Sequence, residues 1–213
     1  MGRPAKFSRE QLQAAALALV DEHGLAGLSM RALANALGTG AMTLYNYVTE
    51  REDLDILVVE AVIAEARWSP GRNRDWREDV RLISTALWKA VRAHPHAIPL
   101  ILTRRSRSPA VFGVSEALLD ALSRGGKSGQ ELLVAFRSVS ALVMGFAQAE
   151  LAGPLAVKAG ETANATIARF RALPAERYRC LIEIATAAES SAPEAEFRAA
   201  LDLLLKGMSA GGD

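Results

Sequence analysis

The side chains best suited to chemistry lie close together in one short segment, and their types fit nucleic acid better than catalysis. Asn46 carries an amide that can bond base edges, and Thr43 can contact a thymine methyl group or a phosphate. Tyr45, Tyr47 and Arg51 suit phosphate oxygens, contacts that position a protein on a duplex without reading its sequence. The segment therefore has the side chains needed to bind double-stranded DNA.

The groups that could serve an enzyme are isolated from one another in the sequence. Cys180 is the single cysteine, and a buried structural thiol is a commoner role for such a residue than a nucleophile. His94 and His96 could chelate a metal, but no cysteine or carboxylate cluster accompanies them. Residues 126–128 (Gly-Lys-Ser) resemble the end of a phosphate-binding loop, but Ala121 stands where its first glycine belongs. We expect no enzyme, no catalytic residue, no cofactor and no metal.

The composition is that of a globular protein in a reducing compartment. The chain has 213 residues, 50% of them hydrophobic and 23% charged, with a net charge of +1. So small a charge excludes a polycation that coats nucleic acid by charge alone. The basic stretch 67–107 could meet anionic lipid, although a solvated or DNA-facing surface is the plainer interpretation. The sequence shows no apolar run of membrane-spanning length and no signal cleavage site, so we expect a cytoplasmic protein without a membrane partner.

Hydrophobic periodicity predicts helices throughout and no strand, so the expected fold class is all-α. Ser8 and Gln11 form a capping box at the start of a first helix, which Gly24 ends. Two short helices follow at residues 30–37 and 41–48, joined by a tight glycine turn. The first helix is long enough to brace the two short ones.

This layout is that of a helix-turn-helix. Gly38 can take the left-handed backbone conformation that the turn requires. Four apolar residues can hold the two short helices together against the first helix: Leu33, Leu37, Leu44 and Val48. The 41–48 helix then presents its outer face to the major groove. On spacing alone, a helical hairpin within an ordinary bundle is the alternative.

Two flanking features extend this module. Arg3 and Lys6 stand in a basic N-terminal arm that can enter a narrow minor groove, with a solubilising tail as the alternative role. Thr49 and Glu52 form a capping box that opens a fourth helix, whose apolar face runs along residues 54–62. The module therefore has an arm before it and a helix leading out of it.

Residues 68–74 are rich in Pro, Gly and polar residues, which indicates a domain boundary. A second region, with longer predicted helices, begins beyond them. The longest helix predicted there, at 129–152, is apolar nearly all round and must be buried on several sides. A helix is predicted at 75–93, and a proline-rich break at 95–99 follows it. Further helices are predicted at 109–124 and at 194–208, and between these two lie two helical segments separated by Pro174.

Three stretches of the N-terminal module, at residues 27–34 (GLSMRALA), 37–38 (LG) and 43–48 (TLYNYV), resemble the DNA-binding signature of the TetR family of transcriptional regulators. The resemblance covers about residues 8 to 62. Residues 173–178 and 197–207 are similar, more loosely, to the C-terminal domain of the tetracycline-repressor type. The resemblance implies a helix-turn-helix DNA-binding domain at 1–50, a connecting helix at 51–67, and an effector-binding and dimerisation domain at 68–213.

The resemblance also implies a function: a homodimeric repressor that a small-molecule effector releases from a palindromic operator. A ligand-responsive activator would use the same fold, and a helical enzyme or a membrane-surface protein are the alternatives from other classes. The residues expected at DNA, from the arm and the family's contact positions, are Arg3, Lys6, Arg31, Ala41, Met42, Thr43, Tyr45, Asn46, Tyr47 and Arg51.

Two further sets of residues follow from the same resemblance. The family's dimer interface is a bundle of the long helix and the last helix of each subunit, which corresponds here to Val139, Val143, Phe146, Phe197, Leu201, Leu204 and Leu205. Its effector pocket lies among the C-terminal helices, with candidate lining residues Trp68, Trp88, His94, His96, Phe112, Phe136, Met144 and Gln148. Residues 98–102 lack the histidine that the tetracycline-binding branch uses, so tetracycline is not the expected effector.

Overall fold

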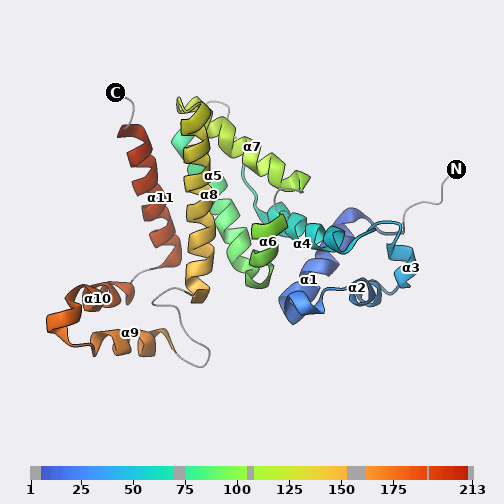
Figure 1. Ribbon diagram of the computed structural model, residues 1–213, viewed down its shortest axis with the longest axis horizontal. Coiled ribbons are helices and arrows are strands. Elements are labelled where there is room, and N and C mark those ends of the chain that lie inside the picture. Colours follow the sequence, from blue (N-terminus) through green and yellow to red (C-terminus); the bar gives the residue numbers. More distant parts are fainter. Residues whose placement is uncertain (1–5, 70–74, 105–107, 153–161, 191, 211–213) are drawn as a thin grey trace. The chain divides into compact units, whose positions relative to one another are not determined.

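The computed structural model describes residues 6–69, 75–104, 108–152, 162–190 and 192–210, and Arg3 of the predicted arm lies outside them. Within these ranges every regular element is a helix, which confirms the all-α prediction (Figure 1). The chain divides into two compact units, Met1–Gly126 and Lys127–Asp213. The first unit reaches far past the connecting helix, because that helix packs against elements on both sides of it in the sequence.

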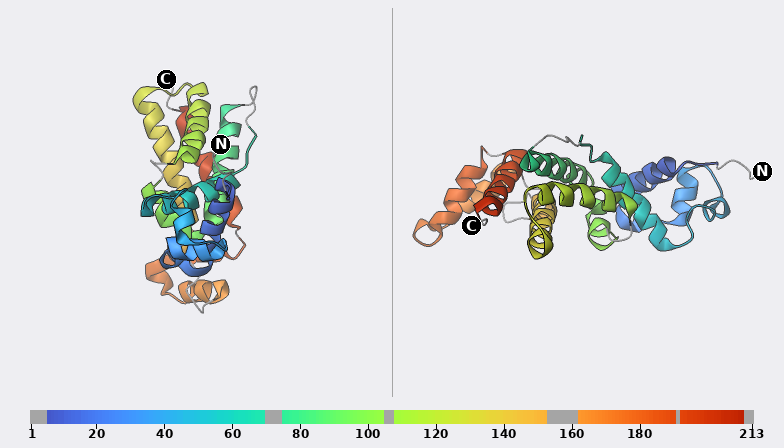
Figure 2. Two further views of the ribbon diagram at one scale, coloured as in Figure 1. Left: turned by 90° about the vertical axis from the view of Figure 1, so that its right-hand side faces the viewer. Right: turned by 90° about the horizontal axis from the view of Figure 1, so that it is seen from above.

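The N-terminal end of the first unit contains α1 (Arg9–Gly27), α2 (Met30–Ala36) and α3 (Ala41–Leu44). The predicted capping box is present, since the Ser8 hydroxyl accepts from Gln11 N–H and Ser8 N–H donates to the Gln11 side chain at 2.8 Å. α1 does not end at Gly24 but bends there, at a φ of 67°, and continues for three residues. Figure 2 shows these helices, in blue, at one end of the first unit.

The connecting helix is α4 (Arg51–Glu65). Its predicted capping box is displaced by one residue: Glu50 is the N-cap and Asp53 is its partner, in place of Thr49 and Glu52. The backbone N–H of Glu50, then the N–H and the hydroxyl of Thr49, hold the pKa of Asp53 below its ordinary value. Every residue from 54 to 63 is buried, because α4 packs against α1 and against the later helices of the unit. A helix enclosed in this way can transmit a displacement from one set of neighbours to the other.

The remainder of the first unit consists of α5 (Trp76–Ala93), the 3₁₀ turn η1 (Pro95–Ala97), α6 (Ile98–Arg104) and α7 (Pro109–Arg124). The sequence predicted a proline-rich break at 95–99 and missed α6. Pro95 and Pro99 each stand in the first turn of a helix, where the missing N–H has no helical partner to lose. The prolines therefore start these helices and do not prevent them.

The second unit contains α8 (Gly129–Ala152), α9 (Ala163–Arg171), α10 (Ala175–Ala188) and α11 (Pro193–Ala210). α8 packs along α11, and α9 pairs with α10 as a helical hairpin. By length and composition α8 would pass for a membrane-spanning helix over Gly129–Ala149, with a mean hydropathy of 1.6, contrary to our expectation. One face of it is nevertheless covered by α11, as a helix in a bundle requires.

Candidate nucleic-acid interface

The recognition helix is built on a small buried base. Gly38 adopts a φ of +61°, and Thr39 N–H donates to the Ala34 carbonyl at 2.9 Å, which closes the turn between α2 and α3. Leu44 and Val48 are fully buried against this turn and the neighbouring helices. α3 is shorter than the predicted 41–48 helix, because residues 45–47 continue it only as a turn.

The outward side of this segment presents many of the residues expected at DNA. Met42 has 80% of its surface exposed, and Tyr45 and Asn46 are exposed beside it. Asn46 donates from its amide nitrogen to the Thr43 carbonyl at 3.3 Å. This bond does not use the amide oxygen, which can accept a hydrogen bond from a base. Arg31 of α2 is exposed too, whereas Ala41 and Thr43 are half-buried. The described members of the set therefore include both outward-facing groups and groups partly covered by the fold.

Tyr47 has a role that the sequence did not indicate. Its hydroxyl accepts the backbone N–H groups of Lys6 at 2.7 Å and of Phe7 at 3.2 Å. The Lys6 ammonium donates to the Thr39 hydroxyl at 3.2 Å, and the Phe7 ring meets the Tyr47 ring edge-on. Tyr47 therefore fixes the start of α1 beside the recognition helix, and its hydroxyl proton stays available for a phosphate.

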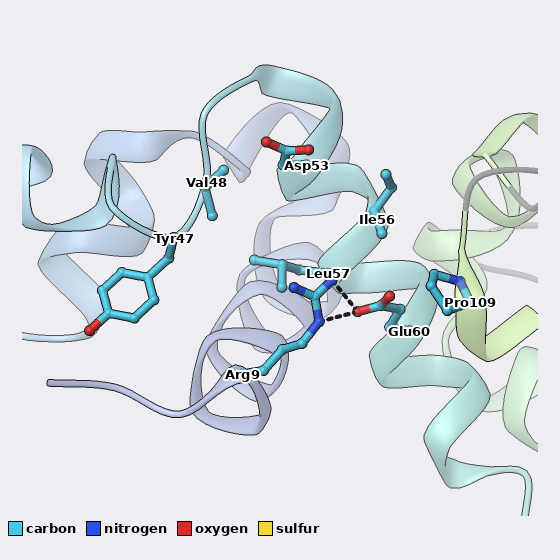
Figure 3. A pocket seen from close by; sticks show the side chains of 8 residues that line it. All are labelled: Arg9, Tyr47, Val48, Asp53, Ile56, Leu57, Glu60 and Pro109. Carbon is cyan, nitrogen blue, oxygen red and sulfur yellow. Dashed lines mark hydrogen bonds and ion pairs between the residues drawn. The ribbon is translucent and has the colours of Figure 1, made fainter. Parts of the chain in front are cut away.

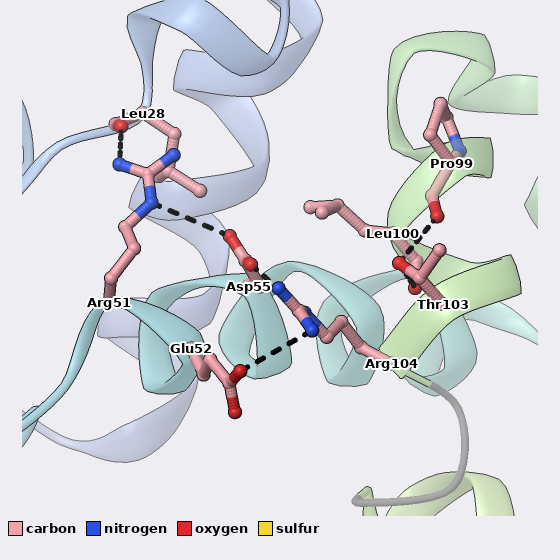
Figure 4. A network of polar contacts seen from close by, with 8 residues as sticks. All are labelled: Leu28, Arg51, Glu52, Asp55, Pro99, Leu100, Thr103 and Arg104. Atoms are coloured by element: carbon pink, nitrogen blue, oxygen red, sulfur yellow. Dashed lines mark hydrogen bonds and ion pairs between the residues drawn. The ribbon is translucent and has the colours of Figure 1, made fainter.

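Arg51 is tied to the protein at several points (Figure 4). Its guanidinium donates to the Leu28 carbonyl in the link between α1 and α2, and its Nε lies 3.8 Å from a carboxylate oxygen of Asp55. Asp55 is buried and also accepts from Arg104 of α6 at 3.2 Å. The polar network thus joins the helix-turn-helix, α4 and α6.

A cavity of about 190 Å³ lies beside the recognition segment, between it, α4 and the first residue of α7 (Figure 3). Tyr47 borders it on one side and Pro109 on the other. Arg9 and the buried Glu60 also line it, and they form an ion pair in which Nη2 of Arg9 lies 2.7 Å from Oε2 of Glu60. The Gln13 side chain donates to the same carboxylate oxygen at 2.8 Å. No residue of the predicted effector set lines this cavity.

The two histidines of the predicted effector set are held at the surface of α1. His94 lies 2.8 Å from a carboxylate oxygen of Asp21 on α1 and 3.0 Å from one of Glu65 at the end of α4. The Nδ1 atom of His96 faces the backbone carbonyls of Val20 and Asp21, each at 3.2 Å. Ring nitrogens of both histidines are thus engaged with other helices of the protein, and a ligand would have to replace these contacts in order to bind them.

The other predicted effector residues are spread over both units. Trp88 is fully buried in α5, Trp68 is half-buried, and Phe112 is exposed on α7. On α8, Phe136 and Met144 are half-buried and Gln148 is exposed. Sequence reasoning missed Ser84, one turn before Trp88: its hydroxyl is buried and has no hydrogen-bond partner among the described residues. A buried hydroxyl without a sequence motif gives no signal that periodicity could detect.

The predicted dimer-interface residues take part in the contact between α8 and α11 of one chain. Phe146 and Phe197 stack edge-on with their ring centroids 5.6 Å apart, and Phe146 and Leu204 remain half-buried. The other five are fully buried: Val139, Val143, Phe197, Leu201 and Leu205. The outward side of the same two helices carries exposed apolar residues instead, among them Val134 and Leu203.

The single cysteine, Cys180, lies outside the helix-turn-helix. Cys180 is exposed on α10, so the expectation of a buried structural thiol is wrong. The backbone of α10 is locally non-helical at Tyr178, two residues before Cys180. Within the described ranges, no three His, Cys, Asp or Glu side chains are arranged to hold a metal ion.

Residues 12–54 match the family model of bacterial regulatory proteins of the tetR family, and residues 69–211 match that of the tetracyclin repressor-like C-terminal domain. An HTH-type transcriptional regulator of Saccharopolyspora erythraea is 33% identical over 155 residues, 70% of this chain and 66% of that protein. The HTH-type transcriptional repressor DrrR1 of Streptomyces coeruleorubidus is 29% identical over 70% of this chain and 56% of its own length.

A solved structure extends the similarity over the whole chain. The TetR family protein ActR of Streptomyces coelicolor, in complex with actinorhodin, is 26% identical with a TM-score of 0.78, covering 98% of this chain and 100% of that one. The matches to the curated relatives span less than two thirds of those proteins' lengths, so they show the family and not the whole activity. The two family models together cover the helix-turn-helix and the C-terminal helices, and the chain belongs to the TetR family of bacterial transcriptional regulators.

Proposed function

We propose that this protein is a homodimeric repressor that binds a palindromic DNA operator and leaves it when a small molecule binds. The observation that carries the proposal is the exposed face of α3 and its following turn, where Met42, Tyr45 and Asn46 stand on a buried base. A rigid base is what a recognition helix needs, because its side chains must meet base edges in the major groove at fixed positions.

The proposed DNA contacts have different tasks. Asn46 reads a base edge through its amide, and Met42 reads shape or a thymine methyl group by apolar contact. Tyr45 and Arg51 contact phosphates, and Lys6 does so from the segment that Tyr47 fixes beside α3. Arg31, Ala41 and Thr43 complete the proposed interface at its margin, and Arg3 would extend it into the minor groove.

We place the subunit contact on the outward side of the α8–α11 pair. The inward side is already filled within one chain, whereas Val134 and Leu203 are 54% and 71% exposed. Phe146 and Leu204 lie half-buried and can be covered by a partner. Two such pairs would form the four-helix bundle that the resemblance implies, with the two recognition helices about one DNA turn apart.

For the effector we propose a site beside α5, in the first unit. Trp88 provides a buried aromatic surface there, and the buried Ser84 hydroxyl lacks a partner among the described residues. An unmade hydrogen bond of this kind costs about 1–3 kcal/mol, which a ligand acceptor or donor would recover. ActR is bound to actinorhodin in its solved structure, so actinorhodin is the first compound to test as an effector of this protein. We place the protein in the cytoplasm, as expected for a regulator of transcription.

The test is selection of binding sites from a random DNA pool by the purified, dimeric protein. We expect a palindrome with half-sites about one helical turn apart. Asn46→Ala should relax base preference at one position per half-site, a change worth about 1–3 kcal/mol between bases, while Arg51→Ala should weaken all sites alike. A folded dimer that enriches no sequence, before and after refolding to remove bound ligand, would contradict the proposal.

A further inference from the structure

A buried carboxylate lies between two arginines where α4 leaves the helix-turn-helix (Figure 4). The side chain of Asp55 is only 7% exposed. One of its oxygens accepts from Nε of Arg104 at 3.2 Å, and the other lies 3.8 Å from Nε of Arg51. The first distance is that of a hydrogen-bonded ion pair, whereas the second leaves a gap of almost an ångström to one.

Arg51 is the member of this network that faces solvent. Its side chain is 54% exposed, and one nitrogen donates to the Leu28 carbonyl. An arginine has five N–H donors, so this bond and the loose contact with Asp55 leave donors for a phosphate oxygen. The position of Arg51 beside the helix-turn-helix is also the one at which the family resemblance places a DNA contact.

Arg104 is the last residue of α6, and it binds two carboxylates of α4. Besides Asp55, its guanidinium lies 3.4 Å from a carboxylate oxygen of Glu52. The side chain is 33% exposed, so it is partly enclosed between the two helices. A cation at the carboxyl end of a helix is favoured by the helix dipole, which helps to hold Arg104 in this place.

The charge of Asp55 must be compensated, because a buried carboxylate without a cation is costly. Arg104 now provides the close contact, so Arg51 can remain at a distance. If α6 moved away, Asp55 would attract Arg51 alone, and the guanidinium would close from 3.8 Å towards the ion-pair distance of about 2.8 Å. That closure would draw Arg51 inward, away from a phosphate on the DNA surface.

We propose that Arg104 is a positioning residue for DNA binding: by neutralising Asp55 it keeps Arg51 free to contact an operator phosphate, and withdrawal of α6 transfers Arg51 to Asp55. The inference rests on the proposed function and names a residue pair by which α6 acts on the DNA-binding surface. It requires a shift of one side chain and not a reorientation of α3. DNA binding would accordingly weaken through a lost phosphate contact without a change in base preference.

The experiment measures operator affinity against salt concentration for four proteins: wild type, Arg104→Met, Asp55→Asn, and the double variant. Each lost phosphate contact lowers the slope of log K against log salt by about 0.9, and a dimer has two copies of Arg51. We expect Arg104→Met to bind roughly tenfold more weakly at moderate salt, with a slope lower by up to about 1.8. The double variant should recover the wild-type slope, because no carboxylate remains to attract Arg51.

The matched control is Arg124→Met. Arg124 donates to the buried Asp79 at 2.6 Å, a comparable arginine–carboxylate pair that joins α7 to α5 and does not involve Asp55. It should reduce thermal stability without changing the salt slope. In an Arg51→Ala background, Arg104→Met should change affinity by less than about twofold, because the contact it controls is already absent.

Three outcomes are decisive. A wild-type slope in Arg104→Met would overturn the inference while leaving the proposed function in place. A double variant as weak as the single one would overturn it too, because Arg104 would then act only through stability. If the wild type shows no selective binding, the proposed function falls, and the inference falls with it.

Discussion

The two ends of α4 are held by the same kind of contact made with different cations. Near its N-terminal end, Arg104 of α6 binds the buried Asp55. At its C-terminal end, His94 lies between Glu65 of α4 and Asp21 of α1. Arginine keeps its charge at every pH at which the protein is folded, whereas histidine titrates near neutrality. One anchor of this helix is therefore permanent, and the other depends on a proton.

The geometry at His94 favours its protonated form. Both ring nitrogens face carboxylate oxygens, and only the protonated imidazolium can donate from both at once. Burial of the ring lowers the pKa of His94, but the hydrogen bonds that the ring donates to Glu65 and Asp21, and the charges of these two carboxylates, outweigh burial and raise the pKa above its ordinary value of 6.5. The neighbouring His96 instead faces two backbone carbonyls of α1, those of Val20 and Asp21.

The two contacts can therefore be disturbed separately. Withdrawal of α6 acts on the Arg104 end, beside the recognition surface, and pH acts on the His94 end, where α1 meets α4. Both contacts join the helix-turn-helix side of the first unit to its later helices. Breaking them one at a time shows which end of α4 controls stability and which controls DNA binding.

The largest effect is expected from Arg104→Met. Removing one partner of a buried pair leaves Asp55 with only the distant Arg51, and we expect the free energy of unfolding to fall by about 2 kcal/mol, less than for a fully enclosed pair because Arg104 is partly exposed. The loss should be the same at pH 6 and pH 8.5. Urea unfolding at both pH values measures it, and a strongly pH-dependent loss would erase the contrast with His94.

His94→Gln should have a smaller effect that depends on pH. The pKa of His94 is raised in the folded state, so its contribution is fully present below the ordinary value of 6.5 and is lost as pH rises through the raised folded value. We expect a loss of about 1 kcal/mol at pH 6 and a much smaller one at pH 8.5. His23→Gln is the control, because His23 is exposed and its ion pair, with the exposed Glu22, is long at 3.7 Å. Equal losses at both pH values would show that His94 is bound without its second proton.

The double variant Arg104→Met with His94→Gln sharpens the comparison further. Asp55 and Glu65 are ten residues apart on one helix, which is roughly 15 Å at about 1.5 Å per residue. At that separation the two losses should add, with a coupling below about 0.5 kcal/mol. A double-mutant cycle in urea at pH 6 measures the coupling, and a clearly larger value would mean that α4 responds as one rigid body to both anchors.

The smallest effect is expected from Glu52→Gln. Glu52 shares Arg104 with Asp55, but its contact is longer, at 3.4 Å, and it lies partly in solvent. Ion pairs of this kind contribute about 0–1 kcal/mol, so we expect a change of no more than about 0.5 kcal/mol and none in the salt slope of DNA binding. A loss as large as that of Arg104→Met would place the essential carboxylate at Glu52 and not at Asp55.

Local signals predicted much of the fold. The Ser8–Gln11 capping box and the glycine turn at Gly38 are confirmed, because a cap or a turn depends on residues within a few positions. The capping box of α4 was misplaced by one residue, because Asp53 competes successfully with Glu52 for the same N–H groups. α6 was missed, because prolines that can end a helix can also begin one.

In the candidate site, too, some features follow from adjacent residues and others from packing. The sequence by itself determined the helical class, the helix-turn-helix and the residue types on its outer side, because periodicity and caps are properties of adjacent residues. Only the tertiary structure decided that Tyr47 holds Lys6, that Arg104 shares Asp55 with Arg51, and that His94 joins Asp21 to Glu65. These partners lie many residues apart in the chain. A charged side chain finds its partner through packing, and no local pattern records which partner that is.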